Sequence, residues 1–153
     1  MKVHRNLLGP ACGAALLACA APAPAASFEF RSVAENAAVL YDAPSAKSRK
    51  LYVVNRGYPL EVVVAVEGWS KVRDASGELT WIENRHLADR RTVMIKVPFV
   101  QVRDRADDAA AVVFQAQQNV IFELLEVAGA GWLHVKHRDG QAGFIKVSQV
   151  WGA

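Results

Sequence analysis

The second half of the sequence repeats the landmarks of the first half in the same order. The pair Gly68-Trp69 recurs 63 residues later as Gly131-Trp132. Four further pairs match at the same spacing: Val72 with Val135, Gly77 with Gly140, Trp81 with Phe144, and Ile82 with Ile145. Ordered matches of this kind indicate two copies of one structural unit of about 60 residues.

Each copy has the pattern of short β-strands separated by tight turns. Apolar and polar residues alternate at 28–31 and 92–97, and β-branched and other apolar residues fill 60–66 and 120–127. Turn-forming residues separate such runs at 42–45, 55–57, 74–77, 129–131 and 138–140. We therefore predict an all-β fold of two tandem small barrels, because closing a short sheet into a barrel protects its strand edges.

The domain boundaries follow from the repeat. After an N-terminal segment, 1–25, we place the first barrel at 26–91 and the second at 92–153. A unit of this size buries only about 60% of its unfolded surface and is marginally stable alone. The connecting residues 87–91 contain no Gly/Ser tract, so we expect the barrels to pack against each other in a fixed arrangement.

The first 25 residues have the organisation of a cleavable secretory signal peptide. Lys2 and Arg5 precede an apolar run from Leu7 to Ala21, and small residues lead to Ala25, the predicted cleavage position. The run is shorter than the roughly 20 residues of a transmembrane helix and is interrupted by glycine and proline. We expect a secreted or periplasmic protein with no integral membrane span; an uncleaved apolar arm is the alternative.

Both cysteines of the chain, Cys12 and Cys19, lie in this N-terminal segment. Cleavage after Ala25 leaves a mature protein with no disulfide, thiol nucleophile or thiolate metal site. The sequence Leu16-Leu17-Ala18-Cys19 also loosely resembles a lipobox, in which an acylated Cys19 anchors the protein to a membrane. A soluble product is the preferred interpretation, and a membrane-anchored lipoprotein is the alternative.

The charge pattern argues against nucleic acid as a partner. The chain has 18 Lys and Arg residues against 15 Asp and Glu, but Lys2 and Arg5 belong to the segment removed on export. The remainder is nearly neutral and lacks the concentrated positive charge that phosphate backbones require. The cluster Arg85, Arg90 and Arg91 has two interpretations: a contact for an anionic polymer or, more commonly, a solvated surface at the domain junction.

The ordered motifs resemble those of bacterial SH3 domains, twice, over nearly all of the mature chain. The first copy has Tyr41-Asp42-Ala43-Pro44-Ser45, Gly68-Trp69, Asp74-Ala75-Ser76-Gly77 and Trp81-Ile82; the second has Gly131-Trp132, Asp139-Gly140 and Gly143-Phe144-Ile145. The first copy has Thr80 where the second glycine of the pattern usually stands, and the second copy lacks the Pro-Ser turn. These departures leave the fold unaffected but put shared ligand contacts in doubt.

The mature sequence shows no recognisable catalytic machinery. An enzyme needs a nucleophile, a tuned acid–base pair or a metal, and no cysteine remains. His134 and His137 lie three residues apart in an expected strand, so their side chains point to opposite faces and cannot chelate one ion without a β-bulge. Nothing pairs Glu61 with Glu123 as glycosidase carboxylates. We predict a non-catalytic protein without a metal or cofactor; a small hydrolase with an unrecognised site is the less favoured alternative.

The candidate binding residues are Tyr41, Trp69 and Trp132. In the second copy Trp132 alternates with Leu133 and Val135 along the expected strand. If Leu133 and Val135 face the core, Trp132 lies on the opposite, polar face. Trp69 occupies the same position in the first copy, and Tyr41 follows Leu40 toward the same face. Such aromatics form stacking platforms for a sugar ring or a peptide side chain; alternatively, each tryptophan caps its barrel or fills the interface between copies. Trp81 and Phe144 are expected in the core.

Exported members of the resembled family are similar to cell-wall-targeting modules, many of which bind peptidoglycan. The resemblance therefore implies a periplasmic module that recognises peptidoglycan or its stem peptides. The alternative partner is an envelope protein, bound through an extended peptide as SH3-like grooves do elsewhere.

Overall fold

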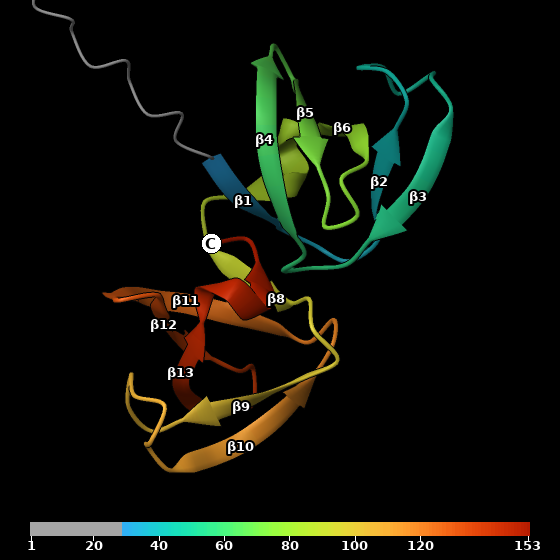
Figure 1. Ribbon diagram of the computed structural model, residues 1–153. Coiled ribbons are helices and arrows are strands. Elements are labelled where there is room, and N and C mark those ends of the chain that lie inside the picture. Colours follow the sequence, from blue (N-terminus) through green and yellow to red (C-terminus); the bar gives the residue numbers. More distant parts are fainter. Residues whose placement is uncertain (1–28) are drawn as a thin grey trace, which may run out of the picture.

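A computed structural model of the chain describes residues 29–153 (Figure 1). The predicted signal peptide, Cys12 and Cys19 lie outside the described residues. Within them the structure is made of β-strands and two short 3-10 helices, arranged in two antiparallel sheets of seven strands each. The part of the chain from residue 29 onward has no helix long and apolar enough to cross a membrane.

The first sheet contains every strand of the first barrel. Its elements are β1 (Glu29–Val33), β2 (Ala38–Tyr41), β3 (Lys50–Val54), β4 (Pro59–Val66), β5 (Trp69–Arg73), β6 (Leu79–Glu83), the 3-10 helix η1 (Asn84–His86) and β7 (Leu87–Ala88). The strands are ordered β3-β2-β6-β5-β4-β1-β7. The sheet forms the upper half of Figure 1 and bends around one apolar core.

The second sheet repeats this order element by element. It contains β8 (Thr92–Ile95), β9 (Phe99–Arg103), β10 (Val112–Gln117), β11 (Ile121–Gly129), β12 (Trp132–Lys136), β13 (Ala142–Lys146), η2 (Val147–Gln149) and β14 (Val150–Trp151). Its order is β10-β9-β13-β12-β11-β8-β14. The prediction of an all-β protein with two tandem copies of one unit is therefore confirmed.

Most of the repeated apolar landmarks occupy equivalent places in the two cores. Val72 and Val135 are fully buried on β5 and β12, and Ile82 and Ile145 are fully buried on β6 and β13. Each strand alternates sides, so the residue before each isoleucine faces outward. Trp81 and Phe144 are accordingly half-buried outside the core clusters. The expectation that they belong to the core was wrong.

A buried aspartate holds the loop between β5 and β6. The carboxylate of Asp74 accepts hydrogen bonds from the amides of Ser76 (2.8 Å) and Glu78 (3.0 Å) and from the hydroxyl of Tyr52 (2.6 Å). Burial alone would raise the pKa of Asp74, but the hydrogen bonds from Ser76, Tyr52 and Glu78 outweigh it and lower that pKa. The charged carboxylate thus stabilises the folded loop.

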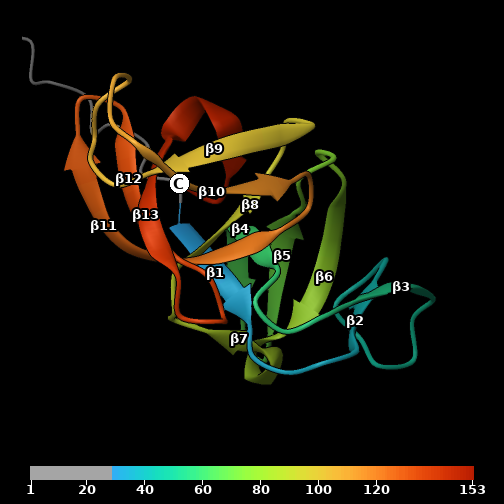
Figure 2. The same cartoon turned by 90° about the horizontal axis from the view of Figure 1, so that it is seen from below.

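The two barrels contact each other directly where the chain passes from one to the other. Only residues 89–91 separate β7 from β8. The hydroxyl of Thr92, at the start of β8, donates a 2.7 Å hydrogen bond to the carbonyl of Gly57 in the first barrel. Both views show β1 and β8 near the junction of the two sheets (Figures 1 and 2). The connection is therefore a packed contact, as expected from a link without glycine or serine.

Residues near the end of the second sheet complete this junction. The indole N–H of Trp151 donates to the carbonyl of Pro59 at 3.1 Å, and its ring meets Phe30 edge-to-face with centroids 5.1 Å apart. The guanidinium of Arg91 lies 5.7 Å from the Phe30 ring and donates to the carbonyl of Gly152 at 3.0 Å. These contacts fix the orientation of one barrel against the other.

Candidate functional site

Two of the predicted binding residues are in contact on the first barrel. The rings of Tyr41 and Trp69 meet edge-to-face with centroids 5.2 Å apart, a geometry that aromatic quadrupoles favour. Tyr41 is only 6% exposed, whereas Trp69 is half-buried. Tyr41 therefore supports the Trp69 ring, and Trp69 offers the accessible surface.

The strand that carries Trp69 explains why its ring faces outward. On β5 the side chains of Ser70 and Val72 are buried, which leaves Trp69 and Lys71 on the outer side. The ammonium of Lys71 lies 6.0 Å from the ring centroid of Trp81, the next outward aromatic on β6. The outer face of the first barrel thus combines half-buried indoles with a cation. The polar-face position that the alternation predicted for Trp69 agrees with this arrangement.

The third predicted residue, Trp132, has different surroundings on the second barrel. It is 8% exposed, and the ammonium of Lys146 lies 5.3 Å from its ring while forming a 2.6 Å ion pair with Asp108. A cavity of about 320 Å³ lies beside Trp132 and is lined only by residues of the second barrel, Phe99 among them. Trp132 therefore does not share a groove with Tyr41 and Trp69.

The position of Tyr41 is occupied by a cation in the second barrel. Tyr41 pairs with Trp81 between β2 and β6, and Arg103 pairs with Phe144 between the equivalent strands β9 and β13. Arg103 donates to the carbonyl of Ala110 at 2.7 Å instead of supporting the indole edge-to-face. The outer faces of the two barrels therefore differ in chemistry, although their strands correspond.

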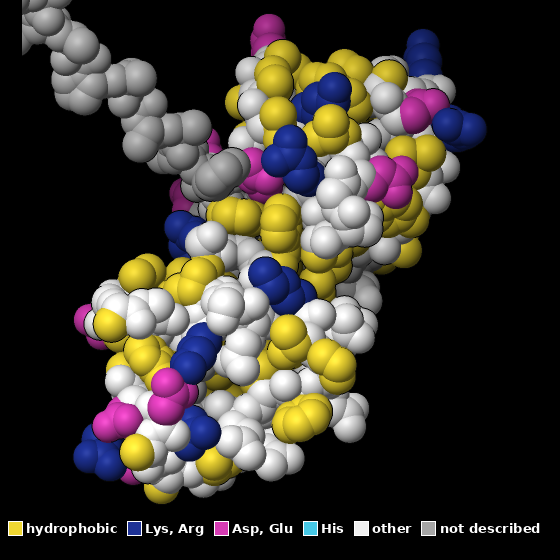
Figure 3. All heavy atoms as spheres, in the orientation of Figure 1, with side chains coloured by type: hydrophobic (Ala, Val, Ile, Leu, Met, Phe, Trp, Pro, Cys, Tyr) yellow, Lys and Arg dark blue, Asp and Glu magenta, His cyan; other side chains and the backbone are white. Residues whose placement is uncertain are grey.

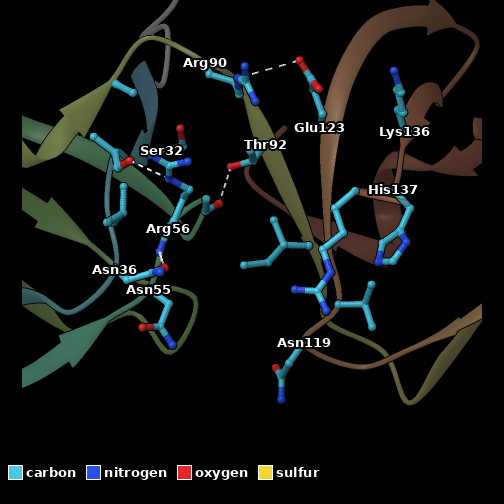
Figure 4. A pocket seen from close by; sticks show the side chains of 17 residues that line it. Ser32, Asn36, Asn55, Arg56, Arg90, Thr92, Asn119, Glu123, Lys136 and His137 are labelled. Carbon is cyan, nitrogen blue, oxygen red and sulfur yellow. Dashed lines mark hydrogen bonds and ion pairs between the residues drawn. The ribbon is translucent and has the colours of Figure 1, made fainter. Parts of the chain in front are cut away.

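A larger cavity, of about 840 Å³, lies between the two barrels (Figure 4). Its lining combines apolar side chains, among them Val33, Val120 and Ile121, with charged and polar ones: the cations are Arg56, Arg90, Lys136 and Arg138, and the carboxamides are Asn36, Asn55 and Asn119. Glu123 is its one acidic lining residue, and the guanidinium of Arg90 lies 3.8 Å from the Glu123 carboxylate. The space-filling view shows Lys and Arg side chains where the two lobes meet (Figure 3). This inter-barrel cleft is a positively charged concave surface.

A family model for the bacterial SH3 domain matches residues 34–89 and again residues 96–152. The chain belongs to the bacterial SH3 domain family. Each of the two sheets corresponds to one SH3 domain, and the cleft lies between the two domains. The family resemblance inferred from the ordered motifs is thereby confirmed.

The solved structures that match this chain have low sequence identity to it. NlpC1 and NlpC2 from Trichomonas vaginalis are 14% and 16% identical, with TM-scores of 0.35 and 0.39 over 84% and 82% of this chain. An NlpC/P60 family protein from Bacillus cereus is 13% identical, with a TM-score of 0.36 over 80% of this chain. The chain spans about half the length of these proteins: 47%, 49% and 55%, respectively. A search of curated proteins gave no significant match.

Arg85, Arg90 and Arg91, which are close together in the sequence, have three different environments in the structure. Arg85 pairs with Glu83 at 2.8 Å on the first domain, and Arg91 lies against Phe30 at the junction. Of that cluster only Arg90 lines the cleft. The other cations of the cleft are Arg56 and, 80 or more residues later, Lys136 and Arg138, so no single local charge pattern predicted the set.

The two histidines of the second SH3 domain have separate environments. His134 stacks on Phe144 with centroids 4.6 Å apart, whereas His137 packs against Phe122 and lies 3.0 Å from the carboxylate of Asp139. Hydrogen bonds from Gln141, together with His137, lower the pKa of Asp139 to about 2. Among residues 29–153 no three ligand side chains are grouped so that they could hold a metal ion.

Proposed function

We propose that the protein is a non-catalytic, exported binding module that recognises cell-wall peptidoglycan. The proposal rests on Trp69, which is half-buried and packed against Tyr41. It lies beside Lys71 and Trp81 on the outer face of the first SH3 domain. An indole face stacks on the apolar side of a sugar ring, and neighbouring cations attract wall carboxylates. Tandem SH3 domains agree with this role.

Within this proposal Trp69 contacts the ligand, and Tyr41 holds the Trp69 ring in position. The edge of one ring against the face of the other restricts rotation of the Trp69 side chain, which lowers the entropy lost when a ligand stacks on it. Trp132, 8% exposed beside Lys146, has little free ring surface. We therefore assign wall contact first to the outer face of the first domain.

Export is part of the same proposal. The N-terminal sequence supports secretion to the periplasm, with cleavage after Ala25. Acylation at Cys19 is the alternative, and it would retain the module at a membrane surface. Mass spectrometry of the protein from the producing cell separates these products, because only the second begins with a lipid-modified cysteine.

A second candidate function is binding to a peptide segment of an envelope protein. The observation that favours it is Phe99, 62% exposed beside the cavity that Trp132 lines. An apolar ring next to a concave aromatic surface suits an extended peptide. In that case Phe99 and Trp132, not Trp69, determine affinity.

Co-sedimentation of the purified protein with purified peptidoglycan tests the two functions. We expect binding by the wild type, a large loss with Trp69→Ala, and little change with Phe99→Ala as the matched aromatic control. Circular dichroism checks that each variant is folded. A wild type that stays in the supernatant at low and moderate salt would refute wall recognition. An envelope partner whose capture depends on Phe99 would then identify the adaptor function.

A further inference from the structure

The cleft between the SH3 domains has an excess of positive charge that the protein itself leaves largely unpaired. Arg90 has Glu123 within 4 Å, whereas Arg56, Lys136 and Arg138 form no ion pair with any residue from 29 to 153. The charges come from both domains: Figure 4 shows Arg56 and Arg90 on one side of the cleft and Lys136 on the other. Like charges gathered in a cavity repel one another, and a bound anion relieves that repulsion.

We propose that this cleft binds a short peptide through its carboxylates. The inference rests on the proposed function, because the peptidoglycan stem peptide is the wall component with this chemistry, and it assigns that peptide to the cleft while the glycan stacks on Trp69. The volume of about 840 Å³ lies within the range of roughly 300–1,000 Å³ typical of small-ligand sites.

Arg56 is positioned to act as a carboxylate clamp. Its Nε donates to the carbonyl of Ala34 at 2.9 Å, and its backbone amide donates to the side-chain oxygen of Asn36 at 3.3 Å. The guanidinium is thereby held in place with its two terminal nitrogens available. A planar guanidinium binds a carboxylate through two parallel hydrogen bonds, which fixes the anion in orientation as well as in place.

The carboxamides of the cleft favour a peptide over a simple inorganic anion. The side-chain oxygen of Asn55 accepts from the amide of Ala37 at 3.4 Å, and that of Asn36 accepts from Arg56. The carboxamide nitrogens of Asn36, Asn55 and Asn119 donate no hydrogen bond to any described residue. Free amide donors match peptide carbonyls, so the lining provides donors for the backbone as well as cations for the carboxylates.

The shape of the cleft is set before any ligand binds. Thr92 hydrogen-bonds to Gly57 within the lining, and a Cβ placed on Gly57 would lie 3.5 Å from Ile121 of the other domain. Trp151 and Arg91 make further contacts at the same junction. A site formed in advance loses less conformational entropy on binding than one that must close.

Calorimetric titration with a synthetic stem tripeptide, its carboxylates free, tests the assignment. The cleft variant is Arg56→Gln/Lys136→Gln/Arg138→Gln; the control is Lys47→Gln/Lys50→Gln/Lys96→Gln, which removes the same charge outside the cleft. We expect the wild type and the control to bind, and the cleft variant to bind at least about tenfold more weakly. Amidating the peptide carboxylates should weaken wild-type binding similarly, which tests the idea without any substitution.

The outcomes separate this inference from the proposed function. Equal tripeptide affinities for the cleft variant and the control would overturn the cleft assignment, even if the wild type still sediments with peptidoglycan. If inorganic phosphate or glycerol phosphate bound the cleft as tightly as the tripeptide and displaced it, the peptide assignment would be overturned in favour of a phosphate site. If the wild type binds neither peptidoglycan nor the tripeptide, both the cleft assignment and the proposed function fail.

Discussion

Gly152 is the position where a single methyl group should most clearly disturb the junction of the two SH3 domains. Its φ is +105°, and a Cβ there would lie 2.5 Å from the carbonyl oxygen of Thr92 and 2.9 Å from Cβ of Pro59. The backbone strain of a non-glycine residue in this region costs about 1–2 kcal/mol. Overpacking a close contact costs about 1–3 kcal/mol. We therefore expect Gly152→Ala to lower the free energy of unfolding by about 2–5 kcal/mol.

Two other glycines separate these contributions. Gly140 has a φ of +97° with no atom within 4 Å of an added Cβ, so Gly140→Ala measures backbone strain alone. Gly143 lies outside the positive-φ region but would place its Cβ 2.6 Å from the carbonyl oxygen of Arg103, so Gly143→Ala measures overpacking alone. Urea denaturation followed by tryptophan fluorescence gives all three free energies. A Gly152→Ala loss no larger than that of Gly140→Ala would refute a close inter-domain contact at this glycine.

Further predictions concern the loop, the core and the junction. Asp74→Asn should lower the free energy of unfolding by about 1–3 kcal/mol at neutral pH, because buried donors lose a charged acceptor. Since the pKa of Asp74 is lowered in the folded state, wild-type stability should decline as pH falls below about 4 and through that folded pKa. Acid denaturation of the variant should lack this decline. Ile145→Ala should cost about 2–5 kcal/mol in urea denaturation, because Ile145 is fully buried; a loss below 1 kcal/mol would contradict its core position. Trp151→Phe should lose about 0.5–1.5 kcal/mol, the net value of its hydrogen bond to Pro59, while keeping ring contact with Phe30; a loss as large as that of Trp151→Ala would contradict this division.

The sequence predicted the repeated unit because its signals are local. Alternation along β5 and β12 placed Val72 and Val135 in the cores and turned Trp69 to the outer face. The same rule, applied to β6 and β13, would have placed Trp81 and Phe144 outside, since Ile82 and Ile145 take the inner positions. Their size and apolar character were given more weight than their register, and this produced the error.

The cleft could not be predicted in the same way. Arg56 lies in the turn between β3 and β4, Lys136 ends β12, and Arg138 lies in the turn that follows it, so each is an ordinary surface cation in its own local sequence. They line one cavity only because Trp151 and Thr92 dock the domains in one orientation. Such docking depends on matching surfaces that are 35 and 92 residues apart along the chain at these two contacts, and neither periodicity nor turn chemistry carries that information.

The position of Trp151 has a consequence for the order in which the protein assembles. The strands that carry Phe30 and Pro59 pair only with one another and with strands of the first domain, so that sheet can be completed while the second is still being synthesised. Trp151 belongs to β14, which joins the second sheet beside β8. The contact of Trp151 with Phe30 therefore requires the last strand of the chain, which is synthesised after the whole first sheet. A folding intermediate with only the first domain formed exposes Phe30 and has no cleft, so acquisition of tripeptide binding would report the final docking step.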